Sequence, residues 1–309
     1  MTPEQLREGW SPRRVGRRIV VLPETSSTNA VALEAVDRPD GLSQPGETSE
    51  SEVDGLAVLA DYQTAGRGRQ GRTWSSPRGA SVLCSVLLFS KEQRAGRDAG
   101  IQADGVDFAS SGGRAGPDAD GDPQSRVGGW LTLASAVAAC EAIRQATELT
   151  PAIKWPNDLR VSERKLGGIL IESRCVDPGR SAGADTRAWV VGIGINCLQQ
   201  AGHFPPELRD STTSLELEAS HPIDRVEVAR ALLRRLDAWL AEAPPPGDHA
   251  VHAAWLKYAE PVGQRVRLLC RGREYTGRTV AVDPSGGLIV QNDDNGRREW
   301  FDPMLTTLL

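Results

Sequence analysis

Three arginines alternate with three glycines in one short stretch of the chain, Gly66 to Trp74. Glycines let backbone amides come close to a ligand, and arginine guanidinium groups supply forked donors for carboxylate or phosphate. A small anionic ligand wrapped by a glycine-rich loop explains both residue types. The sequence therefore predicts an anion-binding loop at 66–74, with Trp74 either in the core or covering a ligand ring.

Two generic phosphate-binding patterns also fall on this loop. Gly66, Gly68 and Gly71 satisfy the dinucleotide-binding spacing GxGxxG, and the stretch would be a P-loop if Arg72 were lysine. Both motifs need a helix that opens directly after the glycines, so that its amides face the phosphate. Residues 74–79 read WSSPRG instead, which is a loop composition. We therefore reject both generic interpretations.

A second group of residues joins KWPNDL at 154–159 to the strand-like run KLGGILIE at 165–172. A hairpin with a surface lysine is the alternative, but two glycines beside Lys165 suit the close approach of a ligand. Lys165 can hold a carboxylate and an α-phosphate together while negative charge builds between them. Asn157 and Asp158 are oxygen ligands of the type that magnesium needs beside a triphosphate.

A third motif, GIGIN at 192–196, ends an apolar run. The pattern alone is weak, since glycine in a strand also marks bulges. Asn196 can read the edge of an adenine, and Gly192 can make room for a flat ligand. This motif adds a candidate nucleotide contact to the first two.

The elements that must position these residues are strands and amphipathic helices. The apolar run 19–22 predicts a strand, and the serines and threonines at 25–28 are expected to cap a helix that runs to Val36. Strands outnumber helices and do not alternate with them in βαβ order, which predicts an α+β fold around a mixed sheet. Further strands are expected at 55–60, 80–90, 152–155, 166–174 and 188–196, and further helices at 131–143, 225–243 and around Trp255.

Composition predicts where the domains begin and end. We expect an N-terminal extension at 1–17, with the first ordered unit at 18–22, a catalytic domain at 18–258, and a C-terminal domain at 259–309. Residues 91–129 are rich in Gly, Asp, Ala, Ser and Arg and are expected to form a disordered insertion ended by two glycines. Short runs at 266–269, 275–282, 288–291 and 299–301 predict a small C-terminal β-barrel of about five strands.

Overall charge and cysteine content exclude several classes of protein. The 309 residues carry a net charge of −5 with a pI of about 5.6, so we expect no nucleic-acid partner. The chain shows neither an exported leader nor an apolar run of about 18 residues, so we expect no membrane association. Five widely spaced cysteines fit buried thiols in a reducing cytoplasm, where we expect the protein to reside.

Taken together and in this order, the motifs resemble those of the biotin protein ligase family, over about residues 18–309. The resemblance implies a catalytic domain related to class II aminoacyl-tRNA synthetases and a C-terminal SH3-like barrel. It implies that biotin and ATP, with Mg²⁺, give biotinyl-AMP and pyrophosphate. The biotin would then pass to a lysine of a biotin carboxyl carrier protein or domain of a biotin-dependent carboxylase, such as acetyl-CoA carboxylase. The motifs that carry the resemblance are TSSTN at 25–29, Gln63 with the loop 66–74, and the three groups at 154–159, 165–172 and 192–196.

The resemblance also implies a role for individual residues. Lys165 and Arg69 are the expected catalytic residues, with Lys165 on the biotin carboxylate and the reacting phosphate. Asn157 and Asp158 are the expected magnesium ligands. The expected biotin-binding residues are Ser27, Thr28, Asn29, Gln63, Gly66, Arg67, Gly68, Arg69, Trp74, Lys165, Gly168 and Gly192, and the expected ATP-binding residues are Arg72, Asn157, Asp158, Lys165 and Asn196.

Two alternatives and one departure accompany this resemblance. A lipoate or octanoyl protein ligase is the runner-up, because that related fold performs a similar acyl transfer. A non-enzymatic nucleic-acid-binding module is disfavoured by the acidic pI and by the lack of interleaved aromatics. Only 24 residues precede Thr25, too few for the N-terminal winged-helix DNA-binding domain of some family members. We therefore expect no repressor role, and a monomer or weak homodimer.

Overall fold

The computed structural model describes residues 1–37, 53–91, 123–176, 186–241 and 249–309. Most of the expected insertion at 91–129 lies outside these residues. The helices are α1 (Pro3–Arg7), α2 (Thr28–Asp37), η2 (Arg69–Gly71), α4 (Pro123–Thr147), η3 (Ala201–His203), η4 (Pro206–Leu208), α5 (Leu215–Glu218), α6 (Arg225–Leu240) and α7 (His249–Leu256). The strands are β1 (Ile19–Leu22), β2 (Ala57–Ala60), β3 (Ser81–Lys91), β4 (Ala152–Lys154), β5 (Asp158–Val161), β6 (Arg164–Cys175), β7 (Thr186–Asn196), β8 (Arg265–Cys270), β9 (Arg273–Val282), β10 (Leu288–Asn292), β11 (Arg298–Phe301) and β12 (Thr306–Leu308).

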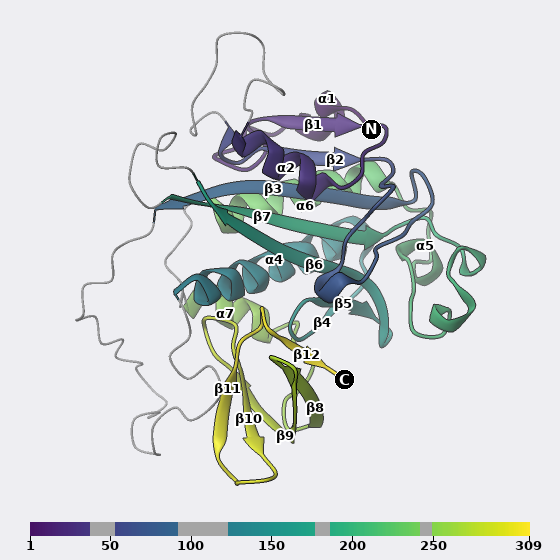
Figure 1. The fold of residues 1–309 in the computed structure, drawn as a ribbon. Helices are drawn as coiled ribbons and strands as arrows, with labels where there is room; N and C mark the ends of the chain where they lie inside the picture. Colours follow the sequence, from purple (N-terminus) through teal and green to yellow (C-terminus); the bar gives the residue numbers. More distant parts are fainter. Residues whose placement is uncertain (38–52, 92–122, 177–185, 242–248) are drawn as a thin grey trace.

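A mixed sheet forms the body of the molecule. Within the described residues it has seven strands in the order β1-β2-β3-β7-β6-β5-β4. β1 and β2 pair in parallel and the other neighbours pair antiparallel, which confirms the predicted α+β fold with a mixed sheet. Figure 1 shows α2 on one face of this sheet and α4 and α6 on the other.

Alternation along β3 explains why both faces of the sheet are covered. The predicted apolar side, which contains Val82, Val86 and Leu88, packs with α4 and α6 in the main core. Leu87 points to the opposite face and packs with α2 in a second core. Ser85 is buried on the same face as Leu87, because side chains two residues apart in a strand point to the same side of the sheet. The fold therefore places one hydroxyl under the start of α2.

The helix α4 begins at Pro123, so the predicted boundary of the insertion at Gly129 is wrong. Gly128 and Gly129 lie inside the helix and are buried. A Cβ on Gly129 would lie 2.1 Å from the carbonyl oxygen of Ser285, and one on Gly128 would lie 3.0 Å from Sδ of Met304. Both positions therefore require a glycine because the helix lies close to the C-terminal domain. The two glycines do not mark a loop.

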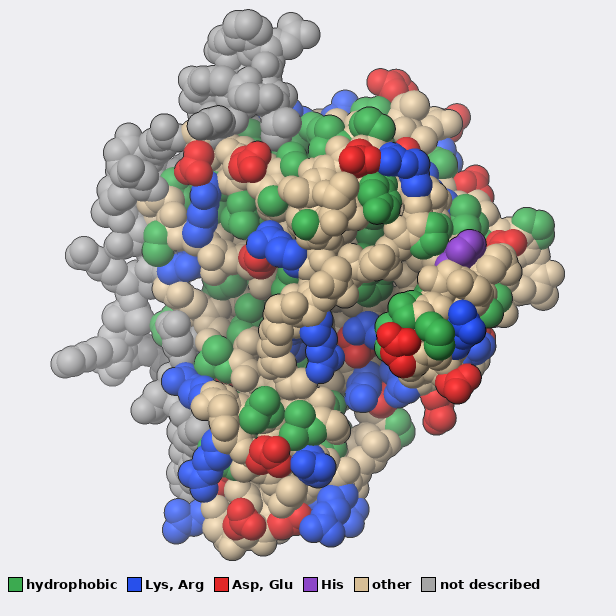
Figure 2. Space-filling view, turned by 45° about the vertical axis from the view of Figure 1, so that its right-hand side comes forward, with side chains coloured by type: hydrophobic (Ala, Val, Ile, Leu, Met, Phe, Trp, Pro, Cys, Tyr) green, Lys and Arg blue, Asp and Glu red, His purple; other side chains and the backbone are tan. Residues whose placement is uncertain are grey.

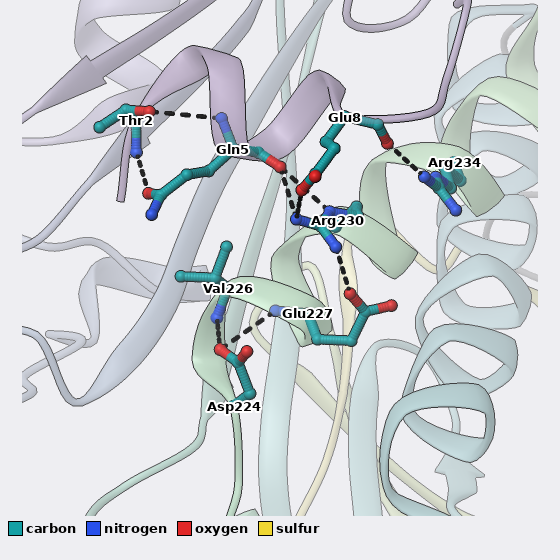
Figure 3. A network of polar contacts seen from close by, with 8 residues as sticks. All are labelled: Thr2, Gln5, Glu8, Asp224, Val226, Glu227, Arg230 and Arg234. Carbon is teal, nitrogen blue, oxygen red and sulfur yellow. Dashed lines mark hydrogen bonds and ion pairs between the residues drawn. The ribbon is translucent and has the colours of Figure 1, made fainter.

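Ordered structure also begins earlier than predicted. α1 precedes the expected first unit at 18–22, and Leu6 and Val15 are fully buried. Figure 3 shows how α1 is tied to α6: Arg230 donates to the backbone oxygen of Gln5 and to Glu8, and Arg234 donates to the backbone oxygen of Glu8. Residues 1–17 therefore pack on the body of the molecule, because buried apolar side chains and arginines of α6 hold them there.

The C-terminal residues form a second, antiparallel sheet in the order β11-β10-β9-β8-β12. Four of its strands match the predicted runs, and the last, β12, was not predicted. This domain rests against the body of the molecule (Figure 1). Trp155 donates its indole N–H to the carbonyl oxygen of Gly286 at 2.8 Å, which fixes the strand following α4 to the C-terminal domain.

All five cysteines are free, and four of them are buried as predicted. Burial raises the pKa of the Cys84 thiol to about 12 and that of Cys197 to about 12. Cys175 is exposed at the end of β6, so the prediction of a buried thiol is wrong there. No helix in the described part of the chain is long and apolar enough to cross a membrane.

Asp237 anchors the segment that leads from α1 into β1. Its carboxylate accepts the backbone N–H groups of Arg13, Arg14 and Val15 at 2.8 to 2.9 Å, and the residue is 3% exposed. We predict that Asp237→Ala lowers the free energy of unfolding by about 2–4 kcal/mol, because buried donors lose a charged acceptor. Urea unfolding followed by circular dichroism measures the change.

The matched control for this prediction is Asp210→Ala, since Asp210 is an exposed aspartate. Removing it is expected to change the free energy of unfolding by less than about 0.5 kcal/mol. Equal, small effects for both variants would show that the Asp237 carboxylate does not stabilise the N-terminal segment.

Candidate functional site

The N-terminus of α2 is capped by a glutamine from another part of the chain. Gln63 Oε1 accepts the backbone N–H of Thr28 at 2.8 Å and its hydroxyl at 3.0 Å. The first N–H groups of a helix have no partner within the helix, so such an acceptor satisfies them. Ser27, Thr28 and Asn29 are all buried here, with at most 5% exposed. The motif at 25–29 and the segment that contains Gln63 therefore meet at one end of α2.

Asn29 continues this cluster across the sheet. Its Oδ1 accepts from the hydroxyl of Ser85, which also contacts the hydroxyl of Thr28 at 2.7 Å. Its Nδ2 donates to Oε2 of Glu172 at 2.7 Å. A Cβ on Gly192 would lie 2.3 Å from Asn29 Oδ1, so Gly192 is the residue that leaves room for Asn29.

The arginine loop is a narrow hairpin that lies across this region. The backbone N–H of Gly68 donates to the oxygen of Arg72 at 2.7 Å, and that of Trp74 donates to Gly66 at 2.9 Å. No α-helix follows the glycines, because the chain runs on into β3. This confirms the rejection of both generic phosphate motifs. Trp74 lies over Gly194, where a Cβ would come within 2.7 Å of its ring.

The three arginines of the loop have different surroundings. Arg67 forms an ion pair with Glu172 at 2.9 Å. Arg69 donates to Asn157 Oδ1 at 3.1 Å and to the backbone oxygens of Pro303 and Thr306. The side chain of Arg72 is exposed and makes no hydrogen bond or ion pair with the described residues.

Arg69 ties the loop to the C-terminal domain. Burial lowers the pKa of its guanidinium, the nearby Asp158 and Asp302 carboxylates raise it, and Arg72 lowers it. Gln70, the next residue, adopts a positive φ of 54° and donates its side-chain amide to the hydroxyl of Thr307. Two consecutive loop residues therefore contact the chain around β12.

Lys165 stands at the beginning of β6, as the sequence predicts. Its Nζ donates to Asp158 Oδ1 at 2.6 Å, and its backbone is held by Ser211 and Thr213. The nearest atoms to a Cβ on Gly168 would lie 3.8 Å away, and they include Lys165 Cε and Asp158 Oδ1. The surface beside the ammonium group is therefore open.

Two of the other candidate ATP contacts, Asn157 and Asn196, are already engaged with the protein. Asn157 donates Nδ2 to the oxygen of Ile169 at 2.8 Å while its Oδ1 accepts from Arg69. Asn196 is 4% exposed; its Nδ2 donates to the oxygen of Thr213 and its Oδ1 accepts from Gln199. In this arrangement Asn196 does not present its amide to an adenine. It instead fixes the segment that supports Lys165.

The donor set at 157–158 does not favour a metal in this arrangement. Both expected magnesium ligands have a cation on their oxygen, Arg69 on Asn157 and Lys165 on Asp158. An adjacent positive charge repels a metal ion and uses the lone pair that the ion needs. For either residue to hold Mg²⁺, its cationic partner would first have to leave.

Three contributors to the site had no role in the sequence-based prediction. Glu172 and Ser85 each join two of the predicted residues, and the chain at 303–306 holds Arg69. A polar residue inside an apolar strand is the signal that could have identified Ser85 and Glu172. The 303–306 contacts are made by backbone oxygens, which have no sequence signal.

A cavity of about 610 Å³ lies elsewhere, between β4, α7 and the C-terminal sheet. Its lining includes Trp155, Trp255 and Val266, but none of the predicted ligand residues. The predicted ligand residues gather around the arginine loop and β6, so the contacts there define the candidate site.

Known proteins resemble this chain in sequence and in structure. The Biotin/lipoate A/B protein ligase family model matches residues 43–107 and 118–196, and the Biotin protein ligase C terminal domain model matches 262–302. The bifunctional ligase/repressor BirA of Bacillus subtilis is 28% identical over 95% of this chain and 75% of its own length. The biotin–[acetyl-CoA-carboxylase] ligase of Mycobacterium tuberculosis is 28% identical over 94% of this chain and 86% of its own.

A solved structure shares the fold. The biotin protein ligase from Aquifex aeolicus, in complex with biotin and ATP, superposes with a TM-score of 0.65 at 23% identity, covering 95% of this chain and 99% of that one. The two matched family models together cover more than half of the chain. The chain therefore belongs to the biotin/lipoate A/B protein ligase family and carries the C-terminal domain of biotin protein ligases.

We predict that Gly192→Ala destabilises the protein by about 1–3 kcal/mol, because the new Cβ collides with the buried Asn29 amide and breaks its contact with Ser85. Gly202→Ala is the control, since nothing lies within 4 Å of a Cβ at that position. Urea unfolding of both variants measures the difference. If the two midpoints coincide with that of the parent protein, the close approach at Gly192 is not a constraint.

Proposed function

We propose that this biotin ligase binds the ring of biotin at the polar residues of the α2 N-terminus and joins its carboxylate to AMP beside Lys165. The family match and the relatives named for biotin support this proposal. The Aquifex relative holds both biotin and ATP. Pyrophosphate would leave, and the biotin would pass to a lysine of a biotin carboxyl carrier protein or domain.

The observation that carries the choice of biotin is the hydrogen-bonding cluster that the buried Thr28 and Asn29 form with the half-buried Gln63. A ureido ring offers one carbonyl and two N–H groups, which such side chains can satisfy. The dithiolane ring of lipoate offers none of these groups, so the unused Gln63 Nε2 donor would lose solvent without gaining a carbonyl partner. Sites of this kind reject analogues that lack the hydrogen-bonding group.

We propose that Lys165 stabilises the charge that builds during the first step. An ammonium group has three N–H donors, and Asp158 uses one of them. The others can reach the biotin carboxylate and the α-phosphate, which would otherwise repel each other. Attack of a carboxylate oxygen on phosphorus forms the mixed anhydride, and the P–O bond to pyrophosphate breaks.

Arg67, Arg69 and Arg72 would complete the anion site. Gly66 and Gly68 would let the loop backbone approach the ligand, and Trp74 would help close it. Arg72 is exposed, has no side-chain partner among the described residues, and suits the ATP phosphates. In the second step the acceptor amine attacks the acyl carbon, and AMP leaves with the electron pair of the broken bond. Excluding water protects the anhydride until then.

Several finer features belong to the same proposal. The mixed sheet suits a catalytic domain related to class II aminoacyl-tRNA synthetases, and the five antiparallel strands suit an SH3-like barrel. Magnesium would accompany ATP, with Asp158 as its ligand only after release from Lys165. The free cysteines fit a cytoplasmic enzyme.

A nucleic-acid-binding module finds no support on the surface that Figure 2 shows. Basic and acidic side chains are interspersed there and do not form one continuous basic area. Two of the loop arginines are also engaged inside the protein, with Glu172 and with the C-terminal domain. An arginine clamp for a phosphate backbone needs such groups free.

Exchange of labelled pyrophosphate into ATP tests the proposed reaction. We expect biotin to support exchange at least about 100-fold better than lipoate at equal concentration, because lipoate offers no carbonyl to the unused Gln63 Nε2 donor. Lys165→Ala should lower the biotin-dependent rate by about 100- to 1,000-fold while circular dichroism stays unchanged. Lys257→Ala, which removes an exposed lysine, is the control.

Two results of this experiment would contradict the proposal. Preferential exchange with lipoate would identify the runner-up, a lipoate or octanoyl ligase. A near-normal rate for Lys165→Ala would show that this lysine is only a surface group on β6.

We predict that Gly168→Ala separates ligand binding from stability. No described atom lies within 3.8 Å of a Cβ there, so the free energy of unfolding should change by less than about 0.5 kcal/mol. A ligand lying against that surface would meet the new methyl group, so biotin affinity should fall about tenfold or more. Titration calorimetry and urea unfolding measure the two quantities. Unchanged affinity would mean that biotin does not lie against Gly168.

A further inference from the structure

Glu172 brings together two residues that the proposed reaction uses but that come from different elements. Its Oε2 accepts from Asn29 Nδ2 of α2 at 2.7 Å and from Arg67 Nη2 of the loop at 2.9 Å. The side chain is 25% exposed, while that of Arg67 is 44% exposed. One carboxylate oxygen on β6 thus joins the polar cluster to the arginine loop.

The contacts form a closed circuit. From Glu172 it passes through Asn29 and Ser85 to Thr28, and from Thr28 to Gln63. Gln63 belongs to the same chain segment as Arg67, whose ion pair with Glu172 closes the circuit. Both ends of residues 63–67 are therefore anchored, one through Thr28 and the other through Glu172.

This circuit determines which way the amide groups point. Because Glu172 can only accept, Asn29 must direct Nδ2 toward it and Oδ1 toward Ser85. Gln63 must direct Oε1 toward Thr28, which leaves Nε2 as a donor that no described residue uses. Gly66 keeps the space beside that nitrogen free of a side chain. A ligand carbonyl would thus meet a donor of fixed orientation.

A carboxylate at this position opposes the binding of anionic ligands, which indicates that Glu172 has a role in the site that offsets this effect. The proposed ligands, a carboxylate and a triphosphate, are both anions, and a fixed negative charge close by opposes their binding. An exposed ion pair would return little, since such pairs contribute about 0–1 kcal/mol. The second, shorter bond to the buried Asn29 amide distinguishes Glu172 from a mere counterion of Arg67.

We propose that Glu172 is a positioning residue that couples the ring-binding amides to Arg67, so that the loop and the polar cluster bind biotin as one preformed unit. The inference rests on the proposed function. Glu172 need not touch biotin itself, since it acts by fixing Asn29 and Arg67. Its loss should weaken biotin binding far more than it weakens the use of ATP.

The experiment compares Glu172→Ala and Glu172→Gln with the parent protein. Two charge-assisted hydrogen bonds are lost in Glu172→Ala, so we expect the Kd and KM for biotin to rise about 10- to 100-fold. The KM for ATP should change by less than about threefold. Glu172→Gln keeps an acceptor oxygen in place and should recover part of the loss, because a neutral acceptor bonds more weakly.

A double-mutant cycle tests the coupling itself. Arg67→Ala combined with Glu172→Ala should raise the Kd for biotin by less than the product of the two single effects, since both remove one interaction. The matched control is Glu260→Ala, which removes a glutamate side chain of similar exposure (28%) that forms an ion pair with Arg160 at 2.7 Å, away from the loop. It should leave the KM for biotin unchanged.

Three results would overturn the inference. The first is a folded Glu172→Ala that binds biotin as tightly as the parent protein. The second is an equal loss of affinity for biotin and ATP, which indicates general damage. The third is multiplicative behaviour in the cycle. If Glu172→Ala does not fold, Glu172→Gln and its cycle with Arg67→Ala decide the question. A parent protein that binds no biotin would instead refute the proposed function, and the inference with it.

Discussion

The site depends on a stretch of sheet that carries almost no side chains. Gly192 and Gly194 on β7 and Gly168 on β6 lie next to one another in the strand register. Asn29 fills the space over Gly192 and Trp74 fills the space over Gly194, while the surface over Gly168 stays open. Any larger residue at the first two positions would push the α2 amide or the arginine loop away from the sheet. The loop can therefore cross the sheet because close backbone packing leaves room for it.

Charge compensation follows from this placement. Three cations of the candidate site have an internal partner: Arg67 has Glu172, Lys165 has Asp158, and Arg69 has backbone oxygens. These partners hold the cations close to where an anionic ligand would lie, which lowers the reorganisation that binding requires. They also explain why a glycine-rich loop of like charges can adopt one conformation, since the repulsion among its arginines is offset locally.

Sequence alone predicted the elements whose patterns are regular and the residues whose chemistry is local. The strand at 80–90, the helix at 225–243 and the lysine beside two glycines on β6 were all correctly placed. Tertiary contacts account for what it missed. Gly128 and Gly129 resembled a loop end because helix-to-domain packing has no local signal, and α1 was missed because α6 arginines hold it. The contacts of the Asn196 amide with Gln199 and Thr213 had no signal in the sequence either, and its role at a ligand stays a prediction.

The C-terminal domain takes part in this arrangement through its backbone. Pro303 and Thr306 hold Arg69 with carbonyl oxygens, and Thr307 accepts from the adjacent Gln70. Trp155, which precedes the Asn157 contact of Arg69, is itself bonded to Gly286 of the same domain. The loop and the 154–159 segment are thus both bonded to the C-terminal domain. Their relative position therefore depends on how that domain packs against the sheet. Because backbone oxygens are offered by every residue type, side-chain changes at 303–306 can preserve this contact as long as the turn keeps its shape. The constraint on the C-terminal domain is therefore one of backbone geometry more than of residue identity.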